Sequence, residues 1–87
     1  MSGRVHANPE DLKQLRRAVD RSQQDIKEAV SNLRRALEKC DWQDPVRRQF
    51  EDRVNELTQN LGKFDQGASE LKPILDRKVR DLEQYLR

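Results

Sequence analysis

The chain has 87 residues, of which 39% are charged and 33% hydrophobic, and its 18 Lys and Arg against 16 Asp and Glu give a formal net charge of +2. A chain of this length forms one domain at most, and so small an excess of positive charge excludes the strongly basic composition of nucleic-acid-binding proteins. Three Gly and three Pro are too few for the turns of a β-sandwich or barrel, and no run of roughly 20 apolar residues could span a bilayer.

Residues 1–8 show no periodicity, and we expect an extended lead-in without a cleavable signal peptide. A helix start follows at Asn8-Pro9, because Asn8 can cap and Pro9 suits the first helical position. Apolar residues then recur at steps of three and four, which predicts an amphipathic helix over about 9–40. The stripe comprises Leu12, Leu15, Val19, Ile26, Val30, Leu33, Leu37 and Cys40, with one polar break at Ser22.

The pattern stops at residues 41–44, and Asp44-Pro45 repeats the capping logic of Asn8-Pro9. A second helix is therefore predicted over about 45–86, with a kink near Pro73 because proline removes one backbone hydrogen bond. Its apolar stripe comprises Val46, Phe50, Val54, Leu57, Leu61, Phe64, Ala68, Leu71, Leu75, Val79, Leu82 and Leu86. Two long helices joined by so short a turn lie antiparallel, so residues 9–87 form one all-α hairpin domain.

A lone hairpin covers only part of two such stripes, and the remainder exceeds the apolar surface that monomers usually expose. We therefore predict that two hairpins pair into a four-helix bundle, as a homodimer or as a heterodimer with a related hairpin or the helical part of a larger protein. The candidate interface residues are Leu15, Val19, Ile26, Val30, Leu33, Leu37, Phe50, Leu57, Leu61, Phe64 and Leu71.

Two long amphipathic helices with Trp42 in the turn at mid-sequence resemble the WXG-type, ESAT-like helical hairpins of bacterial type VII secretion. The resemblance covers nearly the whole chain and is anchored on Trp42-Gln43-Asp44, where the family has Trp-X-Gly and this chain has Asp44 at the third position. The C-terminal Tyr-x-x-x-Asp/Glu export signal of actinobacterial members is absent, because only Leu86 and Arg87 follow Tyr85. The resemblance implies a non-catalytic secretion substrate or a small chain that pairs with a larger effector, made in the cytoplasm. Without the signal, either a partner chain supplies one, export is driven differently, or the protein is not exported.

Two residues near the turn allow two interpretations each. Trp42 either recognises a partner or covers the end of the hairpin core, with its indole N–H donating to a turn carbonyl. Cys40 lies in the apolar register and is expected to be a small buried side chain, the alternative being an intermolecular crosslink or a reactive thiol. A single Cys cannot form an intramolecular disulfide.

Nothing in the sequence indicates catalysis, a cofactor or a metal site. His6 has no companion ligand, and the carboxylates follow the exposed helix faces with Lys and Arg between them. The Arg pairs at 16–17, 34–35 and 47–48 have acids within helical reach, so we expect charge-paired surfaces and no nucleic-acid binding. The alternative functions are a cytosolic coiled-coil adaptor or chaperone-like module and, more weakly, a membrane-surface amphipathic protein.

Overall fold

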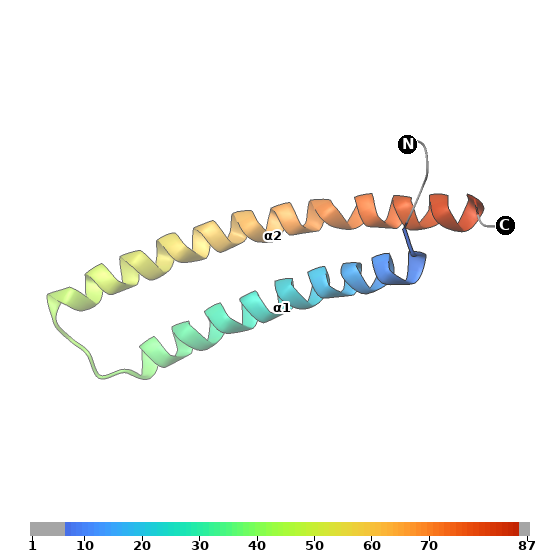
Figure 1. Cartoon of the computed structure of the whole chain (residues 1–87). Helices are drawn as coiled ribbons and strands as arrows, with labels where there is room; N and C mark the ends of the chain where they lie inside the picture. Colours follow the sequence, from blue (N-terminus) through green and yellow to red (C-terminus); the bar gives the residue numbers. More distant parts are fainter. Residues whose placement is uncertain (1–6, 86–87) are drawn as a thin grey trace.

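The computed structural model describes residues 7–85, which form two long helices packed side by side (Figure 1). Helix α1 spans Pro9–Lys39 and helix α2 spans Pro45–Tyr85, so the chain is the predicted all-α hairpin. The rod measures 65 × 21 × 18 Å. The predictions for residues 1–6, including most of the lead-in and His6, and for Leu86 fall outside the described residues.

The local chemistry of the capping residues sets the start of α1. Asn8 has extended backbone angles, and its side chain accepts hydrogen bonds from the N–H groups of Glu10 at 2.8 Å and Asp11 at 3.3 Å. Both acids also place negative charge at the positive end of the helix dipole. The helix ends where Cys40 turns extended, one residue before the predicted end, and the Cys40 N–H donates to the carbonyl of Leu37 at 3.1 Å.

Helix α2 runs for 41 residues and continues through Pro73 without a break. Figure 1 shows a gradual curve along this helix, and the local kink near residue 73 stays a prediction. The continuation beyond Pro73 brings Val79 and Leu82 into the same seam as the earlier apolar residues, and both are buried. The last turns of α2 therefore still pack against the first turns of α1.

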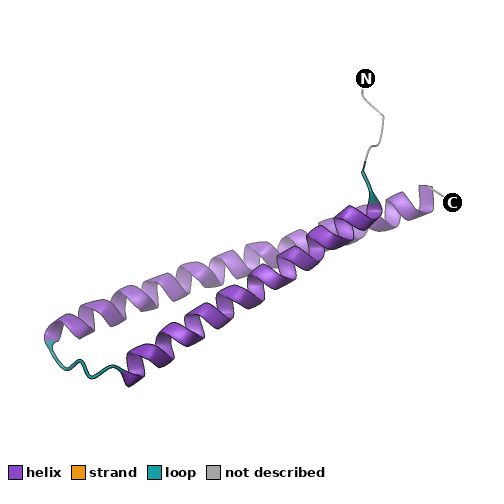
Figure 2. Ribbon diagram, turned by 60° about the horizontal axis from the view of Figure 1, so that its bottom comes forward, coloured by secondary structure: helices purple, strands orange, loops and turns teal. Residues whose placement is uncertain are grey.

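Figure 2 shows the two helices side by side, and the core of the hairpin is a thin seam between them. Its buried apolar residues are Val54, Ala68, Val79 and Leu82, and Gln23 is the buried polar residue. Among the described residues, no large side chain is fully buried. Each helix is covered by a single neighbour, which leaves the rest of its apolar stripe in contact with solvent.

Candidate protein-docking face

Nine residues of the apolar stripe of α2 form two rows with a seven-residue spacing. The first row, Val54, Leu61, Ala68, Leu75 and Leu82, lies against α1 and is buried or half-buried. The second row consists of Phe50, Leu57, Phe64 and Leu71, whose exposed fractions are 40%, 47%, 51% and 50%. A spacing of seven residues is close to two helical turns, so each row keeps to one side of the helix. The second row therefore lies to one side of the seam with α1, from Phe50 to Leu71.

Helix α1 contributes a matching set of apolar residues. Leu15 is 51% exposed and Leu33 is 36% exposed, whereas Val19, Ile26, Val30 and Leu37 are half-buried. A groove of about 210 Å³ joins the two helices on this side, lined by Leu15, Ala18, Val19, Ser22, Phe64, Ala68 and Leu71. The exposed residues of both helices thus share one side of the hairpin.

We call this side the open apolar face. It comprises the exposed residues Leu15, Leu33, Phe50, Leu57, Phe64 and Leu71 and the half-buried residues Val19, Ile26, Val30, Leu37 and Leu61. These eleven residues are the candidate interface predicted from the sequence, and Leu61 among them belongs to the row that lies against α1. Single exposed apolar residues are ordinary on protein surfaces, but a continuous strip of this kind is typical of an interaction site.

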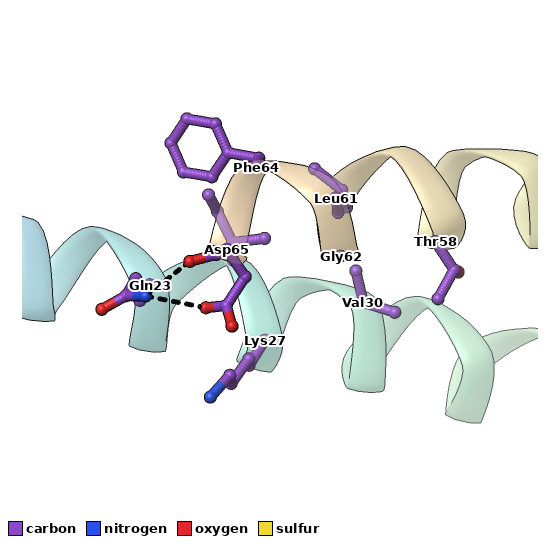
Figure 3. Close-up of a pocket in the computed structure, with 9 residues that line it drawn as sticks. Gln23, Lys27, Val30, Thr58, Leu61, Gly62, Phe64 and Asp65 are labelled. Carbon is purple, nitrogen blue, oxygen red and sulfur yellow. Dashed lines mark hydrogen bonds between the residues drawn. The ribbon is translucent and has the colours of Figure 1, made fainter. Parts of the chain in front are cut away.

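A cavity of about 240 Å³ opens between the helices at the middle of the hairpin (Figure 3). In Figure 3 Thr58 points from α2 toward α1, while Phe64 points away from α1. Gly62 lines the cavity, and a Cβ added there would meet nothing within 4 Å. At this level the seam of the hairpin is incompletely filled.

The other side of the hairpin is polar, and its charges pair within the chain. Ion pairs between the helices join Lys13 to Glu83 at 2.9 Å, Arg16 to Asp76 at 2.7 Å and Asp20 to Lys72 at 2.6 Å. Nearer the turn, Arg34 donates to Thr58 Oγ1 at 2.9 Å. The charged groups named here thus pair within the chain, in contrast to the side chains of the open apolar face.

Two of these pairs shift the titration of their members. The hydrogen bond from Lys72 holds the pKa of Asp20 below its usual value. Hydrogen bonds to Glu83 and then to Glu10 raise the pKa of Lys13. Both shifts favour the charged forms. The pairs therefore stabilise the contact between α1 and α2 at pH values where the Asp20 carboxylate and the Lys13 ammonium group are both charged.

The turn is built around the carboxylate of Asp44. Its Oδ1 accepts from the indole Nε1 of Trp42 at 2.9 Å and from the backbone N–H groups of Val46 at 2.8 Å and Arg47 at 3.3 Å. Asp44 thus caps α2 as predicted, whereas the indole N–H donates to this carboxylate and not to the expected turn carbonyl. The ring of Trp42 lies 5.6 Å from that of Phe50, centroid to centroid, at the end of the open apolar face.

Arg47 is a structural residue that the sequence analysis missed. Its guanidinium donates to the carbonyls of Trp42 at 2.9 Å, Cys40 at 3.2 Å and Leu37 at 3.2 Å, and it pairs with Glu51 at 3.4 Å. Carbonyls at the C-terminal end of α1 lack partners within the helix, so a cation there is favourable. Arg47 therefore fixes the end of α1 to the start of α2.

The prediction that Cys40 is buried is wrong. Cys40 is exposed, because it lies one residue beyond α1 and has left the helical register that would have buried it. The polar residue in the seam was also not foreseen. Ser22, the polar break in the α1 stripe, is exposed, and its neighbour Gln23 is the buried residue, with 7% of its surface exposed. Helix α2 covers the side of the stripe on which Gln23 lies, so Ser22 is turned toward the open apolar face.

Gln23 is hydrogen-bonded across the seam. Its Nε2 donates to the backbone oxygen of Asp65 at 3.0 Å, to Asp65 Oδ1 at 3.1 Å and to Ser69 Oγ at 2.9 Å. Because these partners all belong to α2, the amide fixes the register of the two helices at mid-length. Within residues 7–85, no buried side-chain nitrogen or oxygen lacks a hydrogen-bond partner.

Comparison of the chain with protein-family models, with curated proteins and with solved structures gives no match. In the part of the chain that the structure describes, no group of three or more His, Cys, Asp or Glu residues is arranged to hold a metal ion. Neither described helix combines the length and the apolar character needed to cross a membrane. The feature that distinguishes this hairpin is the open apolar face.

Proposed function

We propose that the chain is a non-enzymatic helical-hairpin protein that docks through its open apolar face onto the helices of another hairpin, forming a four-helix bundle. The observation that carries this proposal is the second row of α2, in which Phe50, Leu57, Phe64 and Leu71 are each 40–51% exposed. In helical bundles such a row packs between the residues of a facing helix. Here the facing helix must come from another chain, since α1 already covers the first row.

The shape and chemistry of the two sides support this mode of docking. The polar side pairs its charges between α1 and α2, so an added protein would gain little there. The open apolar face offers apolar contacts along α2 from Phe50 to Leu71, with grooves between the helices that could accept side chains of a partner helix. A helical rod is the partner shape that can contact such a face over its full length.

The finer proposal is that docking serves protein export. Two long helices, the central Trp42 and the capping residue Asp44 resemble the WXG-type hairpins. In the turn of this chain the Trp42 indole donates a hydrogen bond of 2.9 Å to Asp44. On this proposal the chain is a type VII-like secretion substrate, or a small partner that accompanies a larger secreted effector. Asp44 replaces the family's glycine and supplies a cap that glycine lacks.

Export can be tested in the cells that make the protein. The tagged chain is measured in culture medium from cells with and without the ATPase of a type VII-like system, with a cytosolic enzyme as the lysis control. The proposal predicts chain in the medium only when the ATPase is present. A Leu57→Glu variant, which places a charge in the docking face, should stay inside the cells, whereas Gln59→Glu on the same helix should be exported normally.

The alternative function is a cytosolic coiled-coil adaptor or assembly module unrelated to export. It uses the same open apolar face, so both proposals predict loss of partner binding in Leu57→Glu. They differ in where the chain accumulates. Retention inside cells regardless of the ATPase, with a partner still bound through the open apolar face, favours the adaptor and contradicts the export proposal.

A further inference from the structure

A row of charged residues borders the open apolar face along the outer side of α2. Glu56, Lys63, Glu70 and Arg77 are all exposed and follow one another at intervals of seven residues. The first three directly precede Leu57, Phe64 and Leu71, so this row lies about 100° around the helix from the second row, and the row of Arg53, Gly67 and Asp81 lies between the two. Their signs alternate along the helix, from negative at Glu56 to positive at Arg77.

When a second copy of α2 runs in the opposite direction beside the first, this order of charges places opposite charges next to each other. If a second α2 runs antiparallel to the first, Glu56 meets Arg77 of the other copy and Lys63 meets Glu70 of the other copy. Both pairs are centred on the same point, between Gln66 and Gly67. Each pair occurs twice in a two-fold dimer, so all four charges of the row have a partner of opposite sign.

A second set of charges on α2 indicates the same centre. Arg53 and Asp81 are exposed, and both belong to the row with seven-residue spacing that also contains Gly67. Reversal about Gly67 places Arg53 beside Asp81 of the other copy. The within-chain contact of Arg53 to Glu56 is long, at 3.7 Å between highly exposed side chains, and does not compete strongly.

Helix α1 carries a shorter version of the pattern. Asp11, Asp25 and Lys39 are exposed and lie 14 residues apart, on the outer side of α1 next to the open apolar face. Reversal about Asp25 places Asp11 beside Lys39 of the other copy. Gln23 bonds to Asp65 and Ser69, so it lies level with Gly67, and Asp25 is about 3 Å further along the rod at 1.5 Å per residue. The two helices thus indicate nearly the same axis.

We infer that the occupant of the open apolar face is a second copy of this chain, placed antiparallel by a two-fold axis that passes beside Asp25 and Gly67. This axis stacks α1 on α1 and α2 on α2, so complementary charges meet on both flanks of the apolar contact. The inference rests on the docking mode proposed above and adds the identity and orientation of the partner.

The other symmetric arrangement of two copies has both turns at the same end and stacks α1 on α2. It would bring Asp81 near Asp11 of the other copy and Arg53 near Lys39 of the other copy, which are contacts between like charges. Glu70 would have no cation opposite it, because Asp11, Asp25 and Lys39 are the charged residues of the facing row. The antiparallel arrangement brings one like pair together, Asp25 with its own copy at the axis.

Charge reversal tests the pairing directly. In Lys63→Glu, both copies of the Lys63–Glu70 contact become repulsive, and the same holds for Glu70→Lys. Each variant alone should dimerise about tenfold more weakly than the unmodified chain at low salt, with a smaller loss at high salt. An equimolar mixture of the two variants should recover the original affinity, because each introduced charge then faces an opposite charge on the other chain.

The control is Arg80→Glu, which also reverses a positive charge but lies on α2 away from the open apolar face, and it should leave dimerisation unchanged. Asp25 lies beside its own copy at the axis, so Asp25→Asn should tighten the dimer. If the two single variants dimerise as well as the unmodified chain, or if their mixture associates no better than either alone, the inference is wrong.

The native cysteine allows the relative orientation of the two copies to be measured. Cys40 is exposed, and a spin label on it in each copy would report one distance. The antiparallel axis places the two labels about 45–50 Å apart, from the helical rise of 1.5 Å per residue. An arrangement with both turns at the same end would bring them within about 25 Å, because neighbouring helices pack 8–10 Å apart. The short distance would overturn the inference.

A monomeric chain would also overturn the inference, yet it would leave the proposed function open to a non-identical hairpin. That case is separable, because binding of another hairpin protein would still be lost in Leu57→Glu and kept in Gln59→Glu. If no chain of either kind binds the open apolar face, the inference and the docking proposal fail together.

Discussion

Gln23 in α1 donates from one nitrogen to both the backbone oxygen and the carboxylate of Asp65 in α2, at 3.0 and 3.1 Å. This contact lies at the middle of a seam that is otherwise apolar. Gln23→Ala would leave the two Asp65 oxygens without this donor and open a space in the seam. We expect the free energy of unfolding to fall by about 1–3 kcal/mol in urea titrations.

The neighbouring residue provides the control for this prediction. Ser22 is exposed, so Ser22→Ala should change the free energy of unfolding by no more than about 0.5 kcal/mol. Equal effects of the two substitutions would mean that the Gln23 amide does not fix the hairpin as described.

Arg47 and Arg48 are adjacent but differ in their contacts. Arg47 donates to three carbonyls around the turn, whereas Arg48 is exposed. Arg47→Ala should lower the free energy of unfolding by about 1–2 kcal/mol, since hydrogen bonds from a charged group are lost at a helix end. Arg48→Ala should be nearly neutral in the same thermal and urea measurements. A larger loss in Arg48→Ala would contradict the described role of Arg47 in the turn.

The ion pair between Asp20 and Lys72 predicts a dependence of stability on acid. Lys72 Nζ lies 2.6 Å from Asp20 Oδ1, and the pKa of Asp20 is lower in the folded chain than its ordinary value of 3.8. The folded state therefore binds this proton less readily than the unfolded state. The stabilisation is present above the ordinary pKa and is lost as pH falls through the lower, folded value.

Asp20→Asn should remove this part of the acid dependence. Urea unfolding between about pH 2 and pH 6 should show a shallower loss of stability toward acid in Asp20→Asn than in the unmodified chain. Asp52→Asn, a substitution at an exposed carboxylate elsewhere on α2, should keep the original slope. An unchanged slope in Asp20→Asn would show that this pair contributes nothing to the acid limb.

Gly62 offers a substitution that should stabilise the hairpin. It lies inside α2, and an added Cβ would meet no atom within 4 Å. Gly62→Ala should therefore raise the free energy of unfolding by roughly 0.5–1 kcal/mol through helix propensity. A loss of stability, measured by thermal unfolding, would indicate that the space beside Gly62 is occupied in solution.

The helix boundaries were predictable because local residues set them. Asn8-Pro9 and Asp44-Pro45 carry their own capping oxygens, and the structure uses Asn8 and Asp44 as caps. The side of the α1 stripe that faces α2 was not predictable in the same way. A spacing of three and four residues gives the stripe but not the direction of the neighbouring helix, and this is why Gln23 was missed.

A signal for Gln23 did exist in the sequence, since Gln23, Val30 and Leu37 follow one another at intervals of seven residues. The contacts of Arg47 had no such signal. They depend on how the turn brings residues 37, 40 and 42 around the start of α2, and this geometry is not expressed in any periodicity. The exposure of Cys40 follows from the same turn, which ends α1 one residue early.

The most direct test of the central claim is the mass of the purified chain in sedimentation equilibrium, measured over a wide range of concentrations. We expect twice the chain mass of 10.3 kDa, a shift to the monomer in Leu57→Glu, and an unchanged dimer in Gln59→Glu. A chain that stays monomeric at every concentration and is stably folded would contradict the claim that a second copy of the chain covers the open apolar face.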